Sequence, residues 1–239
     1  MRASGRIVAE VLAAMETAIE PGVTTAELDM LAESIIAGHR GARPAFKGYG
    51  GFPAAICASV NEEVVHGIPS ESRALQVGDI VGIDVGVLLD GYHADAARTF
   101  AVGAVANGTE ALLRVTRQAL EAGIEAARAG GFVGDISAAV QRVAEEAGYS
   151  VVRDLVGHGI GQHLHEDPQV PNFGTPGRGL VLEPGLVLAI EPMVNTGASP
   201  VRTLDDEWTI VTADGTLSAH FEHTVAITDN GPEVLTRAA

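Results

Sequence analysis

Four carboxylates stand where the surrounding sequence is apolar, and a carboxylate in such surroundings needs a partner. These residues are Asp84, Asp95, Glu191 and Glu222. Asp84, for example, interrupts the apolar run at residues 80–89. Burying a carboxylate costs free energy unless it is paired or bound to a cation. A turn or solvent position for one residue would explain an Asp pair alone, but four such carboxylates together favour a cation site.

The spacing of Asp84 and Asp95 predicts how they meet. Asp90-Gly91 lies between them and is typical of a two-residue hairpin turn. With that turn as the loop, the numbers of paired residues sum to 181, so Asp84 lies opposite Ala97. Asp95 is then a diagonal neighbour on the same strand face, roughly 7–8 Å away at the backbone. The two carboxylates can reach one point, where they repel each other unless they are protonated or bound to metal.

A histidine between glycines adds a nitrogen donor. His158 stands in the segment Gly157-His158-Gly159-Ile160-Gly161, and glycine allows a close approach of the backbone to a bound group. His163 follows and is interpreted as structural. One imidazole with several carboxylates suits Mn(II), Fe(II), Co(II) or Zn(II) better than a closed structural zinc site.

The elements that must position these residues follow from hydrophobic periodicity and turn signals. Thr24 and Glu27 have the spacing of a capping box. We expect helices near 7–15, 24–36, 110–128 and 136–147, an ordered loop at 38–53, and strands at 80–89, 92–102, 186–194, 207–213 and 216–228. Asp214-Gly215 predicts a second hairpin. This order favours an α+β fold of two related halves that share a cleft.

Composition excludes several functions. The chain has 239 residues, with 31 acidic and 15 basic side chains and a net charge of −16, so it lacks the basic face that nucleic acids or anionic membranes require. Apolar residues make up 46%, which is typical of a globular protein. Cys57 is the single cysteine, and no signal segment or bilayer-spanning run is evident. We expect a cytoplasmic protein.

The motifs around these residues strongly resemble the methionine aminopeptidases. They are Val65-His66-Gly67-Ile68-Pro69, Ile83-Asp84-Val85-Gly86, His93-Ala94-Asp95, Gly157-His158-Gly159-Ile160-Gly161, His165-Glu166-Asp167-Pro168, Ala189-Ile190-Glu191-Pro192-Met193 and Phe221-Glu222-His223-Thr224. The resemblance extends from the first helix to Gly231, without the amino-terminal zinc-finger extension or the helical insert of other types. It implies a bacterial-style type I enzyme with the "pita-bread" fold, a single catalytic domain of residues 1–239 with pseudo-symmetric halves at about 1–128 and 129–239.

The resemblance also implies roles for individual residues. Asp84 would be a terminal ligand of one divalent metal, Asp95 and Glu222 would bridge two metals, and His158 and Glu191 would complete the second. The metal-held water would attack the first peptide bond. Glu191 is implied as the general base and acid, and His165 and His66 as groups that contact the scissile peptide.

An apolar pocket for the methionine side chain is implied as well. Its lining would be Tyr49, Phe52, Cys57, Leu164 and Trp208. Phe52 and Leu164 replace the usual tyrosine and phenylalanine, which leaves the shape of the pocket open. Ordinary core packing is the alternative for Trp208. The implied substrate is the N-terminal methionine of nascent polypeptides with a small second residue, handled by a monomer that contacts the ribosome transiently.

Two alternatives of the same fold can be distinguished. A proline-specific aminopeptidase would share the five ligands, but such enzymes usually carry a large amino-terminal domain. A metal-free binding protein of this fold would typically have lost ligands, and all five are present here.

Overall fold

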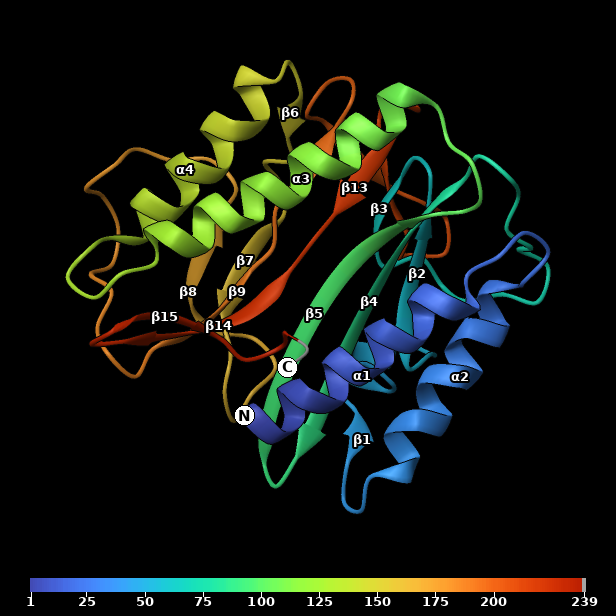
Figure 1. The fold of residues 1–239 in the computed structure, drawn as a ribbon, viewed down its shortest axis with the longest axis horizontal. Coiled ribbons are helices and arrows are strands. Elements are labelled where there is room, and N and C mark those ends of the chain that lie inside the picture. Colours follow the sequence, from blue (N-terminus) through green and yellow to red (C-terminus); the bar gives the residue numbers. More distant parts are fainter. Residues whose placement is uncertain (238–239) are drawn as a thin grey trace.

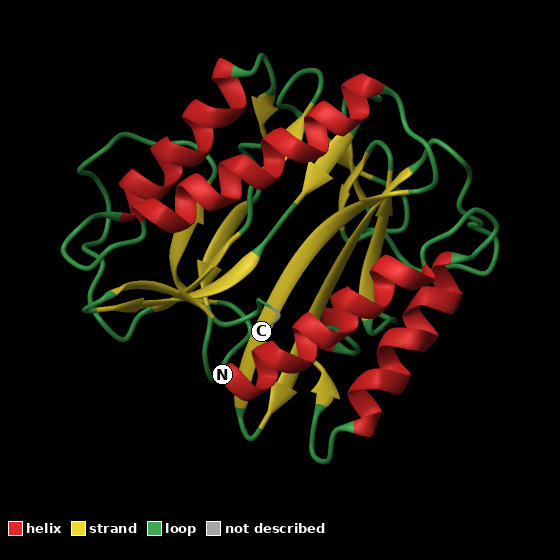
Figure 2. Cartoon of the chain, in the orientation of Figure 1, coloured by secondary structure: helices red, strands yellow, loops and turns green. Residues whose placement is uncertain are grey.

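Four helices and a set of curved antiparallel sheets make up the chain, seen in a computed structural model that describes residues 1–237 (Figure 1). The helices are α1 (Arg2–Ala18), α2 (Thr25–Gly38), α3 (Asn107–Ala126) and α4 (Val133–Glu146), and a short 3₁₀ turn spans Tyr49–Gly51. The helices lie in two pairs on the outside of the strands (Figure 2). The expected α+β class is confirmed.

All four expected helices form. The helices α1, α3 and α4 begin a few residues before the expected bounds, and α2 begins at Thr25, next to the expected start. Burial explains the helical pattern of α1, since its buried positions include Ile7, Val8, Val11 and Met15. The capping box before α2 is present: Glu27 N–H donates to Thr24 Oγ1 at 3.2 Å, and Thr24 N–H donates to Glu27 Oε2 at 2.7 Å.

The first half of the strands is organised by one long hairpin. Strands β4 (Ile80–Leu89) and β5 (Tyr92–Ala101) pair in the predicted register, with Asp84 opposite Ala97 and Gly86 opposite Asp95. Asp90 and Gly91 at the turn have φ of 50° and 81°, as a tight two-residue loop requires. Strands β1 (Arg43–Pro44) and β2 (Ile56–Val60) pair with the other edge of β4.

The remaining strands form three sheets. The bounds are β3 (Glu63–Val65), β6 (Ser150–Val151), β7 (Val156–Gly159), β8 (Glu166–Pro171), β9 (Val187–Ile190), β10 (Met193–Asn195), β11 (Val201–Thr203), β12 (Ile210–Thr212), β13 (Ser218–His220), β14 (His223–Thr228) and β15 (Gly231–Val234). Their orders are β15-β14-β9-β7-β8, β13-β10-β6 and β11-β12-β3.

Two predicted strands are interrupted where a candidate ligand stands. The expected strand 186–194 divides into β9 and β10 at Glu191-Pro192, because proline has no N–H for a ladder. The expected strand 216–228 divides into β13 and β14 at Phe221-Glu222. Glu191 and Glu222 therefore lie in breaks between strands, where the chain passes from one sheet to another.

The predicted hairpin at Asp214-Gly215 was wrong. The turn forms, but the strands before and after it, β12 and β13, belong to different sheets. The Asp214 carboxylate accepts hydrogen bonds from Ala198 N–H at 2.8 Å and from Thr216 Oγ1 at 2.7 Å. These side-chain bonds fix the turn without any pairing of the flanking strands.

Two hydrophobic cores lie on either side of the central strands. One packs α1 and α2 against β4 and β5, and the other packs α3 and α4 against the strands of the second half. Because α3 belongs to the second core, we propose that the halves divide in the 102–107 connection rather than at residue 128. Among the described residues, no helix is both long and apolar enough to cross a membrane.

Candidate metal centre

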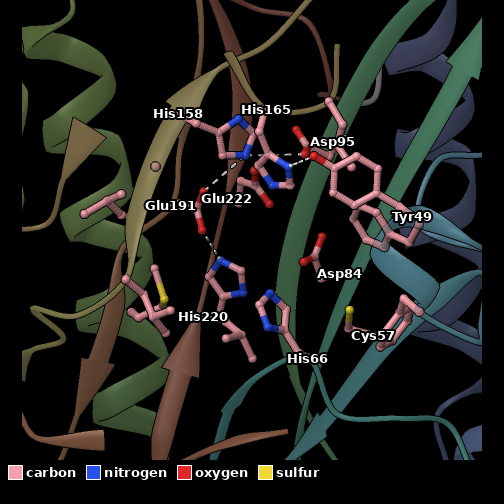
Figure 3. A pocket seen from close by; sticks show the side chains of 18 of the residues that line it. Tyr49, Cys57, His66, Asp84, Asp95, His158, His165, Glu191, His220 and Glu222 are labelled. Carbon is pink, nitrogen blue, oxygen red and sulfur yellow. Dashed lines mark hydrogen bonds and ion pairs between the residues drawn. The ribbon is translucent and has the colours of Figure 1, made fainter. Parts of the chain in front are cut away.

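The five predicted ligands come together at the junction of the two halves (Figure 3). Asp84 and Asp95 project from β4 and β5, His158 from β7, and Glu191 and Glu222 from the two strand breaks. The junction is held by backbone and threonine contacts. Glu222 N–H donates to Ala97 O at 2.8 Å, and Asp95 N–H donates to Thr224 Oγ1 at 3.0 Å.

The distances between donor atoms are those of a cluster that can share a cation. His158 Nε2 lies 3.5 Å from Glu191 Oε1 and 3.8 Å from Asp95 Oδ2. Asp95, His158 and Glu222 each offer one atom within 4.8 Å of the others. The predicted convergence of Asp84 and Asp95 is visible in Figure 3, where both carboxylates face the same space.

A positive charge would stabilise the ionised carboxylates of the cluster. Burial raises the pKa of Asp95 to about 6. Burial, and next the neighbouring carboxylates, raise the pKa values of Asp84, Glu191 and Glu222 well above their usual range. Asp84 Oδ1 is buried with no hydrogen-bond partner among the described residues. Buried carboxylates that repel each other and include an orphaned oxygen fit a site for divalent cations.

The glycines beside His158 have a role in strand packing. A Cβ on Gly157 would collide with Ala189 O of β9, and a Cβ on Gly159 would collide with Asp167 O. Both glycines therefore permit a close approach between neighbouring strands, and Gly157 also lines the cavity. It fixes β7, and with it the imidazole of His158, against the neighbouring strands.

Two further histidines line the same space. His66 follows β3 with φ of 60°, a conformation that residues other than glycine adopt rarely and often at functional sites. His165 packs against His158 with ring centroids 4.3 Å apart, and its Nδ1 lies 2.8 Å from Tyr49 Oη. Burial lowers the pKa of both His66 and His165, and a neighbouring histidine lowers each pKa further. Both imidazoles are therefore neutral at neutral pH.

The cluster of candidate ligands lines a cavity of about 620 Å³. All the predicted pocket residues line it: Tyr49, Phe52, Cys57, Leu164 and Trp208. Phe52 and Trp208 meet edge to face with ring centroids 5.1 Å apart. Cys57 is the Cα partner of Asp84 across β2 and β4, so the pocket wall and a candidate ligand lie side by side.

Sequence reasoning missed His220, which lines the same cavity. Its side chain is buried, and its Nε2 lies 3.7 Å from Glu191 Oε2. The signal was available, because His220 is two residues before Glu222, but no motif drew attention to it. His163 does not line the cavity, and its side chain is 82% exposed.

Comparisons with known proteins agree with this geometry. A model of metallopeptidase family M24 matches residues 1–229. The chain belongs to metallopeptidase family M24. It is 56% identical to the methionine aminopeptidase of Clostridium acetobutylicum, covering 99% of this chain and 94% of that one, and 44% identical to that of Escherichia coli. Within M24 it therefore belongs with the bacterial type I methionine aminopeptidases.

Solved M24 structures support the same placement. The crystal structure of methionine aminopeptidase from Thermotoga maritima superposes with a TM-score of 0.98 at 48% identity and covers 100% of this chain and 95% of that one. A prolidase from Pyrococcus furiosus superposes with a TM-score of 0.79 at 24% identity and shares the fold. This chain covers only 63% of that prolidase. The pita-bread fold of the M24 family is thereby confirmed.

Proposed function

We propose that this chain releases the N-terminal methionine from polypeptides by hydrolysis of their first peptide bond, with preference for a small second residue. One observation carries the proposal: four carboxylates and a histidine meet in a cavity that apolar and aromatic side chains also line. Asp95 and Glu222 are buried, and Asp84 and Glu191 are partly buried. The carboxylates and the histidine fit divalent cations, and the apolar and aromatic lining fits an unbranched apolar side chain. The relatives at 44–56% identity are named methionine aminopeptidases.

The proposed metal ligands divide between two ions. Asp84 would serve one ion, Asp95 and Glu222 would serve both, and His158 with Glu191 would complete the other. The oxygen-rich donor set suits Co, Mn, Fe or Zn as divalent ions. When bound, such ions supply a water of lowered pKa and polarise the scissile carbonyl.

The proposed roles of the other polar residues follow from their protonation. Burial raises the pKa of Glu191, which suits a carboxyl that takes up a proton and passes it to the leaving amine. His66 and His165 are neutral, so each offers one N–H and one free nitrogen lone pair. In this arrangement His165 donates to the oxygen of the scissile peptide group, and His66 contacts the same peptide or the residue after it.

The proposed methionine subsite is the aromatic part of the cavity. Phe52 and Trp208 form its wall, and the small side chain of Cys57 leaves depth beside Asp84. Leu164 is less than 2% exposed and also lines the cavity. A flexible thioether adapts to a slot of this irregular shape, which a β-branched side chain fits less well.

Three properties of the working protein remain proposals of the same kind. We expect a cytoplasmic monomer that meets its substrate as the polypeptide leaves the ribosome. A single buried cysteine agrees with a reducing compartment. The net charge of −16 agrees with a protein that makes no specific contact with nucleic acid or anionic membranes. Sedimentation of the purified chain tests the monomer.

Hydrolysis of two peptides tests the function. After removal of adventitious metal and addition of Co(II) or Mn(II), the chain is expected to release methionine from Met-Ala-Ser and to leave an Ala-Pro peptide intact. Asp95→Ala and His158→Ala should abolish release, whereas His163→Ala, an exposed histidine outside the cavity, should keep it. Cleavage of Ala-Pro with Met-Ala-Ser intact would identify a prolidase instead, and inactivity on both without bound metal would identify a binding protein.

A further inference from the structure

Tyr49 makes a contact that a pocket wall does not need. It lies on the 3₁₀ turn Tyr49–Gly51, and its side chain is half exposed at 47%. Its hydroxyl lies 2.8 Å from Nδ1 of His165, and the two rings are 5.2 Å apart (Figure 3). An exposed aromatic ring whose polar end is fixed on a histidine in the active cavity points to a role for the hydroxyl.

The backbone holds Tyr49 in place even though its ring is half exposed. Tyr49 N–H donates to Phe46 O at 2.8 Å, and Phe52 N–H donates to Tyr49 O at 2.9 Å. Gly48, Gly50 and Gly51 have φ of 87°, 58° and 94°, values that glycine adopts without strain. A Cβ on Gly50 would lie 3.3 Å from the Trp208 ring, so the turn packs directly on the pocket wall.

The apolar cluster beside the cavity does not include Tyr49. The cluster of apolar side chains beside the cavity consists of Phe46, Phe52, Ala54, Cys57, Ile68 and Trp208. Tyr49 lines the cavity but is not part of that cluster. The hydroxyl is therefore the feature that distinguishes Tyr49 from its aromatic neighbours.

The direction of this hydrogen bond is linked to the nitrogen of His165 that carries the proton. A phenol at neutral pH is protonated, and when its O–H donates to Nδ1 the imidazole proton must be on Nε2. Among the described residues, no side chain or backbone group forms a hydrogen bond with Nε2 of His165. When Tyr49 O–H is the donor, Nε2–H is free to donate to a bound substrate.

We propose that Tyr49 is a positioning residue that holds His165 in the tautomer with its proton on Nε2, aimed at the oxygen of the scissile peptide group. The inference rests on the proposed function for the identity of that oxygen. Its structural part, the tautomer of His165, stands independently of any activity. The bond that orients a histidine is commonly the one made by its other nitrogen.

Removing the single oxygen atom of Tyr49 tests the proposal. Tyr49→Phe should lower kcat for Met-Ala-Ser about 10- to 100-fold, in the range seen when a partner that orients an active-site histidine is lost, with KM changed less than about twofold. Tyr92→Phe is the matched control, because Tyr92 is 43% exposed and its hydroxyl has no hydrogen bond within residues 1–237. It should leave both constants unchanged.

A second readout follows the tautomer directly. The ring ¹⁵N resonances of His165, assigned by their loss in His165→Gln, are recorded without metal and again with Zn(II). Native protein should show a protonated Nε2 and a bare Nδ1, and Tyr49→Phe should shift both resonances toward the average of two tautomers. Neither a general loss of stability nor a looser pocket produces that shift.

The outcomes separate this proposal from the proposed function. An unchanged kcat in Tyr49→Phe, a rise in KM alone, or ring resonances that match those of native protein would overturn the positioning role. Failure of the native protein to release methionine would count against the proposed function, while the resonances would still decide the tautomer.

Discussion

At the scale of single residues, the carboxylates of the cluster repel one another in the absence of a cation. Burial raises the pKa values of Asp84, Glu191 and Glu222 well above normal, and neighbouring carboxylates raise them further. A raised pKa means that the folded chain holds protons which the unfolded chain releases, so ionisation of these groups destabilises the fold as the pH rises. These carboxylates therefore lower the stability of the metal-free protein, and a bound cation would offset that loss.

Asp84→Asn should stabilise the metal-free protein and inactivate it. The amide keeps the volume of the carboxylate but removes a buried charge that Asp95 repels, and relief of such a charge is worth about 1–2 kcal/mol in the free energy of unfolding. Urea denaturation at pH 8 in the presence of a chelator measures the change. Metal affinity and methionine release should both fall.

The control is Asp154→Asn, which changes an exposed aspartate by the same one atom. Its free energy of unfolding should stay within about 0.5 kcal/mol of native. A lower stability of Asp84→Asn than of native protein in chelator would show that Asp84 is satisfied without metal.

At the scale of elements, close strand packing places the ligands. His158 depends on β7, which has no room for a side chain at Gly157 because Ala189 O of β9 occupies the space. Gly86 of β4 is similarly restricted, since a Cβ there would meet the Phe46 ring at 2.6 Å. Gly157 thus allows β7 to lie close to β9, and Gly86 leaves room for the Phe46 ring beside β4.

Gly157→Ala should displace β7 and lower metal affinity. A methyl group forced against a strand costs about 1–3 kcal/mol of stability and moves His158 with the backbone. Isothermal titration with Mn(II) and urea denaturation measure the two effects. Gly38→Ala is the matched control, because no atom lies within 4 Å of the new Cβ at the end of α2. If Gly157→Ala bound metal as native protein does, packing of β7 would not be what fixes His158.

The register of the strands could be predicted from the sequence in the first hairpin but not in the second half of the chain. The register of Asp84 and Asp95 was predictable because a two-residue turn fixes every pair in a hairpin. The breaks at Glu191 and Glu222 and the separate sheets around Asp214-Gly215 were not, because pairing with distant strands decides them. The roles of the metal ligands came from resemblance, and His220 escaped notice because only the folded chain brings it beside Glu191.

At the scale of the whole molecule, the metal centre joins two separately packed halves. Asp84 and Asp95 come from the half built on the first core, and His158, Glu191 and Glu222 come from the other. Between them, Thr99 Oγ1 donates to His220 O at 2.8 Å, and Glu222 N–H donates to Ala97 O at 2.8 Å. We propose that a cation held by ligands from both sides would stabilise the arrangement of the halves.

Metal should therefore raise the stability of the whole chain. Binding only to the folded form adds about 2.7 kcal/mol when the free metal is 100 times its dissociation constant. Thermal unfolding, recorded in chelator and then with excess Co(II), should show a clear rise of the midpoint. Asp95→Ala should show a much smaller rise, and an equal rise in both proteins would place the stabilising metal elsewhere.

Methionine release during metal titration tests the central claim most directly. Chelated protein is mixed with Met-Ala-Ser, Co(II) or Mn(II) is added in steps, and free methionine and bound metal are measured at each step. We predict no release in chelator and an activity that rises with metal bound at the Asp84, Asp95, His158, Glu191 and Glu222 site. Full release in chelator, or no release when the site is loaded, would contradict the account.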